Sequence, residues 1–294
     1  MSANANVSAA SRRAWFFLAP ALALVTIFVA WPVASALRLA FFETDGLGHT
    51  RFVGLGNFIE LARDPLLWVS LRNLAVFGAL TVPLQTFGPL LGAKLLHSLG
   101  TGRSAYWYRT LLVVPVVVPG VVTLLTWQQI YANEGPLNQT LRAVGLDAWT
   151  HSWLGEPGTV IPAIVAMGMP WTGGVFVLLY LAAFMAIPNS LYEAARLDWA
   201  RSWQIFWHIE LPMLKPQMRL IAALSFLGIV QNFENIQILT NGGPINASLT
   251  PALHLFKNGF EFGQLGYASA LGVVLLVATA ALVLASQKLG RAAS

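Results

Sequence analysis

Apolar residues gather along the chain in runs long enough to cross a lipid bilayer as helices. A spanning helix needs about 20 predominantly apolar residues, and such runs begin near Ala14, Leu74, Leu111, Val160, Arg219 and Leu265. The second and third runs contain prolines, which membrane helices tolerate because neighbouring groups satisfy the freed backbone. The pattern predicts an all-α integral membrane protein with six transmembrane helices, the second and third of them kinked.

The polar segments between these runs predict how the chain is organised. Residues 1–13 form a tail and residues 14–290 a single transmembrane domain, with outer loops near 42–68, 132–159 and 241–263 and an inner loop at 189–212. In the first outer loop, "GLGNFIELARDP" predicts a turn followed by a short amphipathic helix that ends before Pro65.

The first run also has an alternative interpretation as an export signal. Arg12 and Arg13 precede it as in a twin-arginine signal, and Ala34-Ser35-Ala36 offers a cleavage site. The apolar run is longer than the roughly 7–15 residues of a signal peptide, and five more runs follow it. We therefore favour an uncleaved first helix.

Composition and charge support a membrane protein and set its orientation. Of 294 residues, 56% are hydrophobic and 10% are charged, whereas about a quarter are charged in soluble domains. Basic residues are retained on the cytoplasmic side, and with cytoplasmic termini that side holds 11 of the 17: Arg12, Arg13, Lys94, Arg103, Arg109, Arg196, Arg201, Lys215, Arg219, Lys288 and Arg291. This asymmetry explains the net charge of +5 without a nucleic-acid partner.

The inner loop contains the most unusual segment, "EAARLDWARSWQIFWHIELP", residues 193–212. Ser190 and Glu193 have the spacing of a capping box, so we expect a helix from there to Leu211, before Pro212. Its apolar residues recur at helical spacing and form one stripe: Ala195, Trp199, Trp203, Phe206 and Ile209. Spacing alone leaves three alternatives open: a helix in the lipid headgroups, a helix packed beneath the bundle, or a helix docked in a partner's groove.

The residues of this loop resemble a known signature. Glu193, Ala194, Ala195, Asp198, Ala200, Ile209, Leu211 and Pro212 match the cytoplasmic "EAA" signature of permease subunits of binding-protein-dependent ABC importers. The flanking motifs resemble the carbohydrate-uptake branch of that family, of the maltose-type or glycerol-phosphate-type first permease: "GLGNF", "RTLLVVPVVVPGVV", "WTG", "LTNGGP" and "FGQLGYASAL". The resemblance extends from Trp15 to about Ser286.

The resemblance implies a type I importer bundle in which this loop is a coupling helix seated in a cleft of an ATPase subunit. It assigns the coupling role to Glu193, Ala194, Ala195, Asp198, Trp199, Phe206, Ile209, Leu211 and Pro212. Trp199 stands where the signature has glycine, which predicts a continuous helix in place of the usual turn. For Glu193 the alternative is that it only caps the helix.

The resemblance also implies the partners: a second permease subunit, two ATP-binding subunits, an extracytoplasmic solute-binding protein, membrane lipid and a carbohydrate solute. The expected location is the bacterial or archaeal cytoplasmic membrane. No G-x-x-x-x-G-K-[ST] motif occurs, and "GPLLGAK" at residues 88–94 lies inside an apolar run. We therefore expect no cofactor, metal or catalytic residue in this chain, and ATP and Mg²⁺ on the partner ATPase.

Polar residues in the fifth run predict the solute path. On a continuous helix Gln231, Glu234 and Asn235 share a face, and an acid at mid-membrane costs roughly 2.5–3.5 kcal/mol. Such residues face a cavity or a partner. We expect the path to be lined by Gln231, Asn232, Glu234, Asn235, Trp171, Thr172 and Gly173, with Gln85, Gln128 and Gln129 as weaker candidates.

Other functions for these polar residues stay open. The amides could bond only to neighbouring helices, and Glu234 could pair with the second permease. Glu234 could also take up a proton in a secondary carrier, which would need no ATP and no loop signature. A membrane enzyme acting on lipid would need several reactive groups at one depth, which Glu234 lacks.

Overall fold

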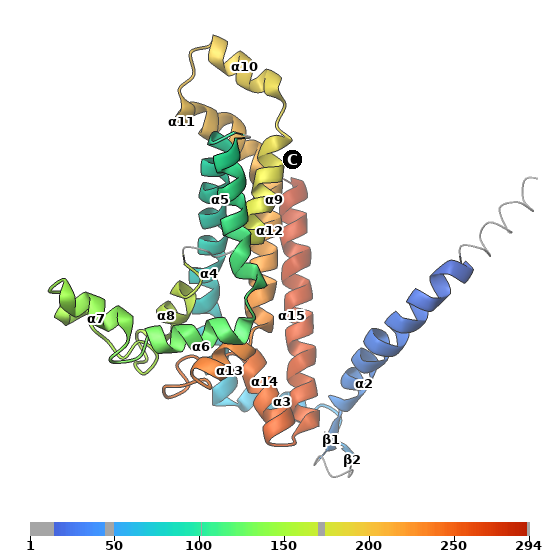
Figure 1. Ribbon diagram of the computed structural model, residues 1–294. Helices are drawn as coiled ribbons and strands as arrows, with labels where there is room; N and C mark the ends of the chain where they lie inside the picture. The colour runs from blue at the N-terminus through green and yellow to red at the C-terminus, as the bar shows by residue number, and fades with distance from the viewer. Residues whose placement is uncertain (1–14, 45–49, 101, 170–173, 293–294) are drawn as a thin grey trace, which may run out of the picture. The chain divides into compact units, whose positions relative to one another are not determined.

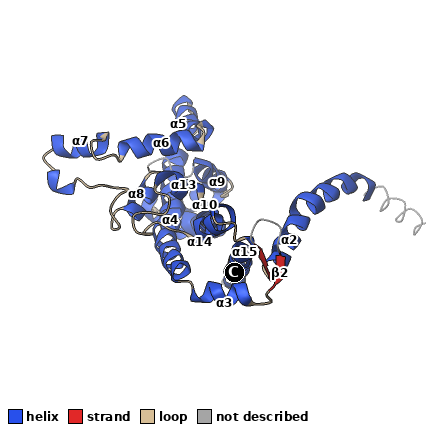
Figure 2. Ribbon diagram, turned by 90° about the horizontal axis from the view of Figure 1, so that it is seen from below, coloured by secondary structure: helices blue, strands red, loops and turns tan. Residues whose placement is uncertain are grey.

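The computed structural model describes residues 15–44, 50–100, 102–169 and 174–292. The regular structure of these residues is helical apart from two short strands, β1 (Phe42–Thr44) and β2 (Thr50–Phe52), drawn in red in Figure 2. The strands pair antiparallel, with Phe42 opposite Phe52 and Glu43 opposite Arg51. The expectation of an all-α chain thus holds except for this hairpin.

The contacts divide the chain into two compact units. Unit 1 contains the described residues up to Asp64 together with Leu255–Val277, and unit 2 contains Pro65–His254 and the residues from Ala278 onward.

Unit 1 begins with an apolar helix, which is followed by a small hairpin and a short helix. The helix Trp15–Leu39 has no buried residues in its most apolar window, and it includes the π-helical turn η1 (Thr26–Ala30) and α2 (Trp31–Leu39). The hairpin and α3 (Gly56–Arg63) follow, and the π-helical turn η5 (Lys257–Glu261) and the first part of α15 (Leu265–Ala292) complete the unit. As predicted, α3 is short and ends before Pro65, because Asp64 has the extended backbone (ψ 113°) that a following proline favours.

Unit 2 is built around three long helices. α4 (Pro65–Ser98), α9 (Gly174–Met185) and α12 (Leu211–Gln231) pack side by side (Figure 1). Their core contains Leu90, Ala93, Tyr180, Phe184, Leu214 and Ile221. The other elements of the unit are α5 (Arg103–Val113), η2 (Val114–Val117), α6 (Gly120–Ile130), α7 (Pro136–Ala143), η3 (Asp147–Trp149), α8 (Val160–Ala166), α10 (Asn189–Leu197), α11 (Ser202–Ile205), η4 (Phe206–Glu210), α13 (Glu234–Leu239) and α14 (Pro251–Phe256).

The described helices include four that are long and apolar enough to span a membrane: Trp15–Leu39, Pro65–Ser98, Ser202–Gln231 and Leu265–Leu284. α9 and α10 together form a fifth candidate, bent by 66°. The third predicted span is interrupted, because α5 ends at Val113 and α6 begins only after Pro119. α4 instead continues past Pro83 and Pro89 without a break.

Candidate functional site

A cavity of about 550 Å³ lies within unit 2. Helices α4, α6, α8, α12 and α13 contribute side chains to it. Its polar lining residues are Thr81, Gln85, Thr123, Ser225, Asn232, Asn235 and Thr250, and Trp127 adds an indole ring. The volume falls in the range of about 300–1,000 Å³ that is usual for small-molecule sites.

The chemistry of this cavity is neutral and rich in hydrogen-bonding groups. None of the described residues that line it carries a formal charge. The hydroxyl of Ser225 is buried and has no hydrogen-bond partner among the described residues. Since a buried unpaired hydroxyl is unfavourable, a hydroxyl of a bound solute or an ordered water is its natural partner. The cavity is therefore suited to a neutral solute with many hydroxyl groups.

A helix break brings part of the predicted path into the cavity. α12 ends at Gln231, Asn232 has an extended backbone (φ −78°, ψ 102°), and α13 begins at Glu234. The backbone N–H of Asn235 donates to Oδ1 of Asn232 at 3.3 Å, which closes the turn. The expectation of a continuous helical face is wrong for this reason.

The break separates the four predicted residues of the fifth run into two pairs. Asn232 and Asn235 line the cavity. Gln231 and Glu234 are exposed and are not among its lining residues. Trp171, Thr172 and Gly173 lie outside the described residues, so their part in the path stays a prediction.

Several residues that line the cavity were not predicted from the sequence, or were predicted only as weaker candidates. Gln85, a weaker candidate, lines the cavity one helical turn beyond Thr81 on α4. No sequence pattern marked Trp127, Thr123 or Ser225 as cavity-lining residues, because single hydroxyls and aromatic residues are common in membrane helices. Only the packing of distant segments brings them together.

The inner loop forms two helical segments joined by a turn, so the prediction of one continuous helix is wrong. α10 ends at Leu197, and Trp199 has the left-handed backbone (φ +56°) that glycine would adopt most easily. The N–H of Ala200 donates to the carbonyl of Ala195 at 2.9 Å and that of Trp199 to the carbonyl of Arg196 at 3.1 Å. These two bonds define a Schellman motif, which holds the turn despite the bulky residue.

The ends of the loop also differ from the prediction. α10 begins at Asn189 after Pro188, with no side-chain cap, so Ser190 and Glu193 do not form the expected capping box. The second segment does not stop before Pro212, because the helix runs from Ser202 to Gln231. The π-helical turn η4 ends at Glu210, two residues before Pro212, and this wider turn accommodates a ring that would clash in a regular α-helix.

The coupling residues divide into an exposed and a packed group. Glu193, Ala194, Asp198, Trp199 and Pro212 are exposed, and Trp199 is 91% exposed. Ala195 is buried, while Phe206, Ile209 and Leu211 pack against the core of unit 2. α10 and α11 lie at the end of the α4, α9 and α12 bundle (Figure 1). The loop is thus anchored on the core of unit 2. Its exposed surface combines polar side chains with large apolar ones, among them Leu197, Trp199, Trp203 and Trp207.

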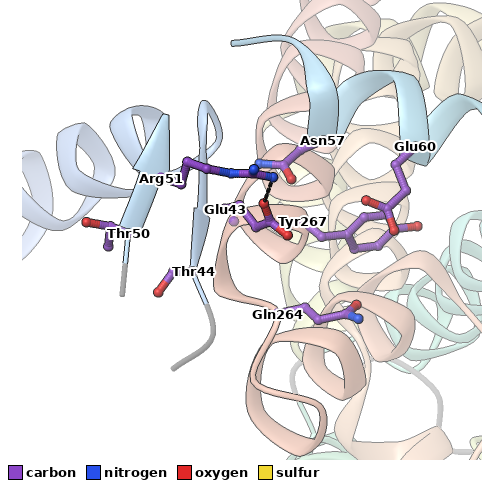
Figure 3. A pocket seen from close by; sticks show the side chains of 9 residues that line it. Glu43, Thr44, Thr50, Arg51, Asn57, Glu60, Gln264 and Tyr267 are labelled. Carbon is purple, nitrogen blue, oxygen red and sulfur yellow. Dashed lines mark hydrogen bonds and ion pairs between the residues drawn. The ribbon is translucent and has the colours of Figure 1, made fainter. Parts of the chain in front are cut away.

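Unit 1 contains a second, more polar pocket of about 440 Å³ (Figure 3). Glu43 and Arg51 on the two strands form an ion pair of 2.7 Å at its edge. Asn57 of α3 donates to the carbonyls of Ala40 and Phe42, and so fixes the hairpin to α3. Tyr267 donates to the Asp64 carboxylate at 2.5 Å. Many of the residues that line this pocket therefore stabilise the fold of unit 1 through contacts with one another.

Two carboxylates of the loop between α6 and α8 bind neighbouring residues of the same loop. The backbone N–H of Ser152 donates to Glu156 at 2.9 Å and, with His151, lowers the pKa of this carboxyl. Glu134 binds Arg142 at 2.7 Å, and this bond lowers the pKa of Glu134. Both carboxylates are ionised near neutral pH, and each joins two segments of the loop.

Comparison with known proteins identifies the family. Residues 68–292 match the family described as "Binding-protein-dependent transport system inner membrane component". The chain belongs to this family. It is 34% identical to "Probable ABC transporter permease protein YurN" of Bacillus subtilis (strain 168), over 93% of this chain and 94% of that protein. It is 32% identical to "Lactose transport system permease protein LacF" of Rhizobium radiobacter, over 91% of this chain and 90% of that protein.

A solved structure confirms the fold. The chain superposes with a TM-score of 0.85 on a subunit of "a bacterial ABC transporter involved in the import of the acidic polysaccharide alginate", at 22% identity and over 97% of this chain and 98% of that one. The superposition shows the type I fold. The family match and the permease relatives make this chain an ABC importer permease subunit, which is not itself an enzyme. This family membership gives no support to a proton-coupled carrier.

Proposed function

We propose that this chain is one of two permease subunits in an ATP-driven importer of a neutral carbohydrate. It crosses the cytoplasmic membrane six times with both termini in the cytoplasm. Its partners are a second permease, two ATP-binding subunits that carry ATP and Mg²⁺, and an extracytoplasmic solute-binding protein. The description of the family as binding-protein-dependent supports the last partner.

The cavity in unit 2 is the observation that carries this proposal. It combines amides, hydroxyls and an indole ring without a charged group among the described residues that line it. Amides and hydroxyls donate to and accept from sugar hydroxyls, and an aromatic ring covers the apolar face of a pyranose. An anionic solute would favour arginine or lysine in the lining. The name of the lactose permease relative supports the same solute class.

The loop at 189–212 is the proposed contact with the ATPase. Its outward surface combines two carboxylates with an exposed indole: Glu193, Asp198 and Trp199. A tryptophan that is 91% exposed would lose apolar contact with water on docking in a cleft. The packed residues Phe206 and Ile209 connect this surface to the helices below.

Transport then follows from two conformations of the same subunits. ATP binding closes the ATPases and favours the conformation whose cavity opens outward, and hydrolysis restores the inward-open one. Nucleotide changes the equilibrium only by its differential affinity for the two states. The solute-binding protein delivers the sugar to the outward-open cavity.

Reconstitution of the co-purified complex in proteoliposomes tests this function. We expect uptake of a radiolabelled neutral sugar that requires ATP and the binding protein. Glu193→Ala should reduce uptake while the complex stays assembled, and Asn235→Leu should raise the sugar concentration needed for half-maximal uptake. Uptake driven by a proton gradient in the absence of ATP would refute the proposal.

A further inference from the structure

A buried ion pair joins two helices of unit 2 near the inner loop. The ammonium of Lys94 on α4 lies 2.5 Å from both carboxylate oxygens of Glu210 in η4. The Glu210 side chain is 1% exposed and that of Lys94 is 29% exposed. Among the residues that the structure describes, Glu210 is the one carboxylate that is buried.

Two further elements hold this pair. Tyr192 of α10 donates from its hydroxyl to Glu210 at 3.2 Å. The rings of Phe184 on α9 and Phe206 in η4 lie 5.8 and 5.9 Å from the Lys94 ammonium, within cation–π distance. We call Lys94, Glu210 and Tyr192 the charged link. It connects α4, α10 and the start of α12 within one hydrogen-bonded group.

Two of the helices joined by the charged link, α4 and the helix Ser202–Gln231, also contribute to the cavity wall. α4 carries Lys94 and also Thr81 and Gln85 of the cavity. Gln85 precedes Lys94 by nine residues, which is about 14 Å along a helix. The helix that contains Glu210 continues without interruption to Ser225 in the cavity wall. A displacement of the loop that moves Glu210 therefore acts on two of the helices that line the cavity, α4 and α12.

A contribution to stability does not by itself explain a buried ion pair at this position. Replacing a buried ion pair with apolar residues of similar size is often neutral or stabilising, because desolvation offsets the attraction. A short two-oxygen contact instead requires one register between its partners. η4 is a π-helical turn, and such turns often occur at functional sites. The pair therefore fixes the position of α12 relative to α4. The hydrogen bond from Tyr192 to Glu210 connects α10 to the same pair.

We propose that the charged link transmits movement of the inner loop to the cavity, with Lys94 and Glu210 as positioning residues for transport. This inference rests on the proposed function, because it assumes an ATPase bound to the loop. It predicts that breaking the link separates ATP hydrolysis from solute uptake without dismantling the complex.

The test compares sugar uptake per ATP hydrolysed in proteoliposomes of the whole complex. The main variant is Lys94→Met/Glu210→Leu, which removes both charges and keeps the volume. We expect it to assemble, to melt near the wild-type temperature and to hydrolyse ATP, with uptake per ATP reduced at least threefold. The matched control is Arg142→Met/Glu134→Leu, which removes an exposed ion pair of the outer loop and should leave the ratio unchanged.

Uptake per ATP within threefold of the wild type in the double variant would overturn the inference. If that variant does not assemble, Tyr192→Phe decides, since it removes one hydroxyl and no charge. A reduced ratio in Tyr192→Phe supports the link, and an unchanged ratio overturns it. Failure of the wild-type complex to couple ATP to uptake would instead refute the proposed function, so the two failures are distinguishable.

Discussion

The cavity end and the loop end of the same two helices differ in chemistry. Around Gln85 and Ser225, the described lining side chains are neutral, the Ser225 hydroxyl has no hydrogen-bond partner among the described residues, and the space is about 550 Å³. Around Lys94 and Glu210, the charges are paired at 2.5 Å and enclosed by aromatic rings. The first region has free hydrogen-bonding capacity, whereas in the second Lys94 and Glu210 are paired with each other.

This difference indicates a division of tasks along α4 and α12. A site that must bind and release a solute benefits from several modest interactions, each worth about 0.5–1.5 kcal/mol. A contact through which two helices move together must instead be directional, and breaking it must cost several kcal/mol, about 3–5 for a buried pair. The following predictions test this division, starting with the largest expected effect.

Removal of one partner of the buried pair should have the largest effect on stability. Lys94→Met leaves the Glu210 carboxylate buried without its cation, which costs roughly 3–5 kcal/mol in other proteins. We expect about 3 kcal/mol, because Lys94 is partly exposed, measured as a lower Tm of the purified complex. Arg142→Met, at an exposed pair, is the control, and equal Tm changes in both variants would contradict the assigned burial.

Loss of a cavity amide should weaken solute binding without affecting stability much. Asn235→Leu removes a donor and an acceptor from the cavity wall and should raise the Kd for the sugar about tenfold, equivalent to about 1.4 kcal/mol. Isothermal titration of the complex measures this change. The control is Gln231→Leu, at an exposed position outside the cavity, and an equal loss of affinity there would show that the amides do not act through the cavity.

Trp199→Gly should stabilise the loop and weaken the ATPase contact. A non-glycine residue with left-handed backbone costs about 1–2 kcal/mol, so glycine at φ +56° should raise the free energy of unfolding by about 1 kcal/mol. The lost indole should at the same time increase the rate at which the ATPase dissociates. Denaturant unfolding and surface plasmon resonance report the two effects. An unchanged dissociation rate of the ATPase would show that Trp199 does not contribute to the contact.

The smallest effect is expected from acidification of the outer loop. The pKa of Glu156 is lowered in the folded state, so its contribution to stability is complete above its ordinary value of 4.5 and is lost as the pH falls through the lower folded value. The hydrogen-exchange protection factors of residues 151–159, which are corrected for the intrinsic pH dependence of exchange, should therefore fall below pH 4.5. Glu156→Gln should remove this pH dependence, and its persistence in that variant would assign the effect to another group.

The sequence predicted the features that depend on local pattern. The apolar runs marked the long helices, and the "EAA" signature marked the family, which the match over residues 68–292 confirms. The turn at Trp199 was not predictable from residue type, because two backbone hydrogen bonds outweigh the unfavourable conformation of this one residue. The path of the helix through Pro212 likewise depends on a π-helical turn that no spacing rule indicates.

The cavity could be predicted only in part. Asn232 and Asn235 were found because polar residues in an apolar run are costly, but the helix break that separates them from Glu234 was not visible in the periodicity. Lys94 and Glu210 are 116 residues apart, and neither had a local pattern that indicated the other. Contacts at such separation are set by the packing of helices, which single-chain periodicity does not specify.

Accessibility of the cavity is the most direct test of the central claim, that the inner loop controls which side of the membrane the cavity faces. The chain has no cysteine, so Asn232→Cys introduces a single thiol into the cavity wall. We predict that a membrane-impermeant maleimide labels it from the outer side when ATP and the binding protein are present, and from the inner side when nucleotide is absent. Labelling from the same side in both conditions would contradict the account.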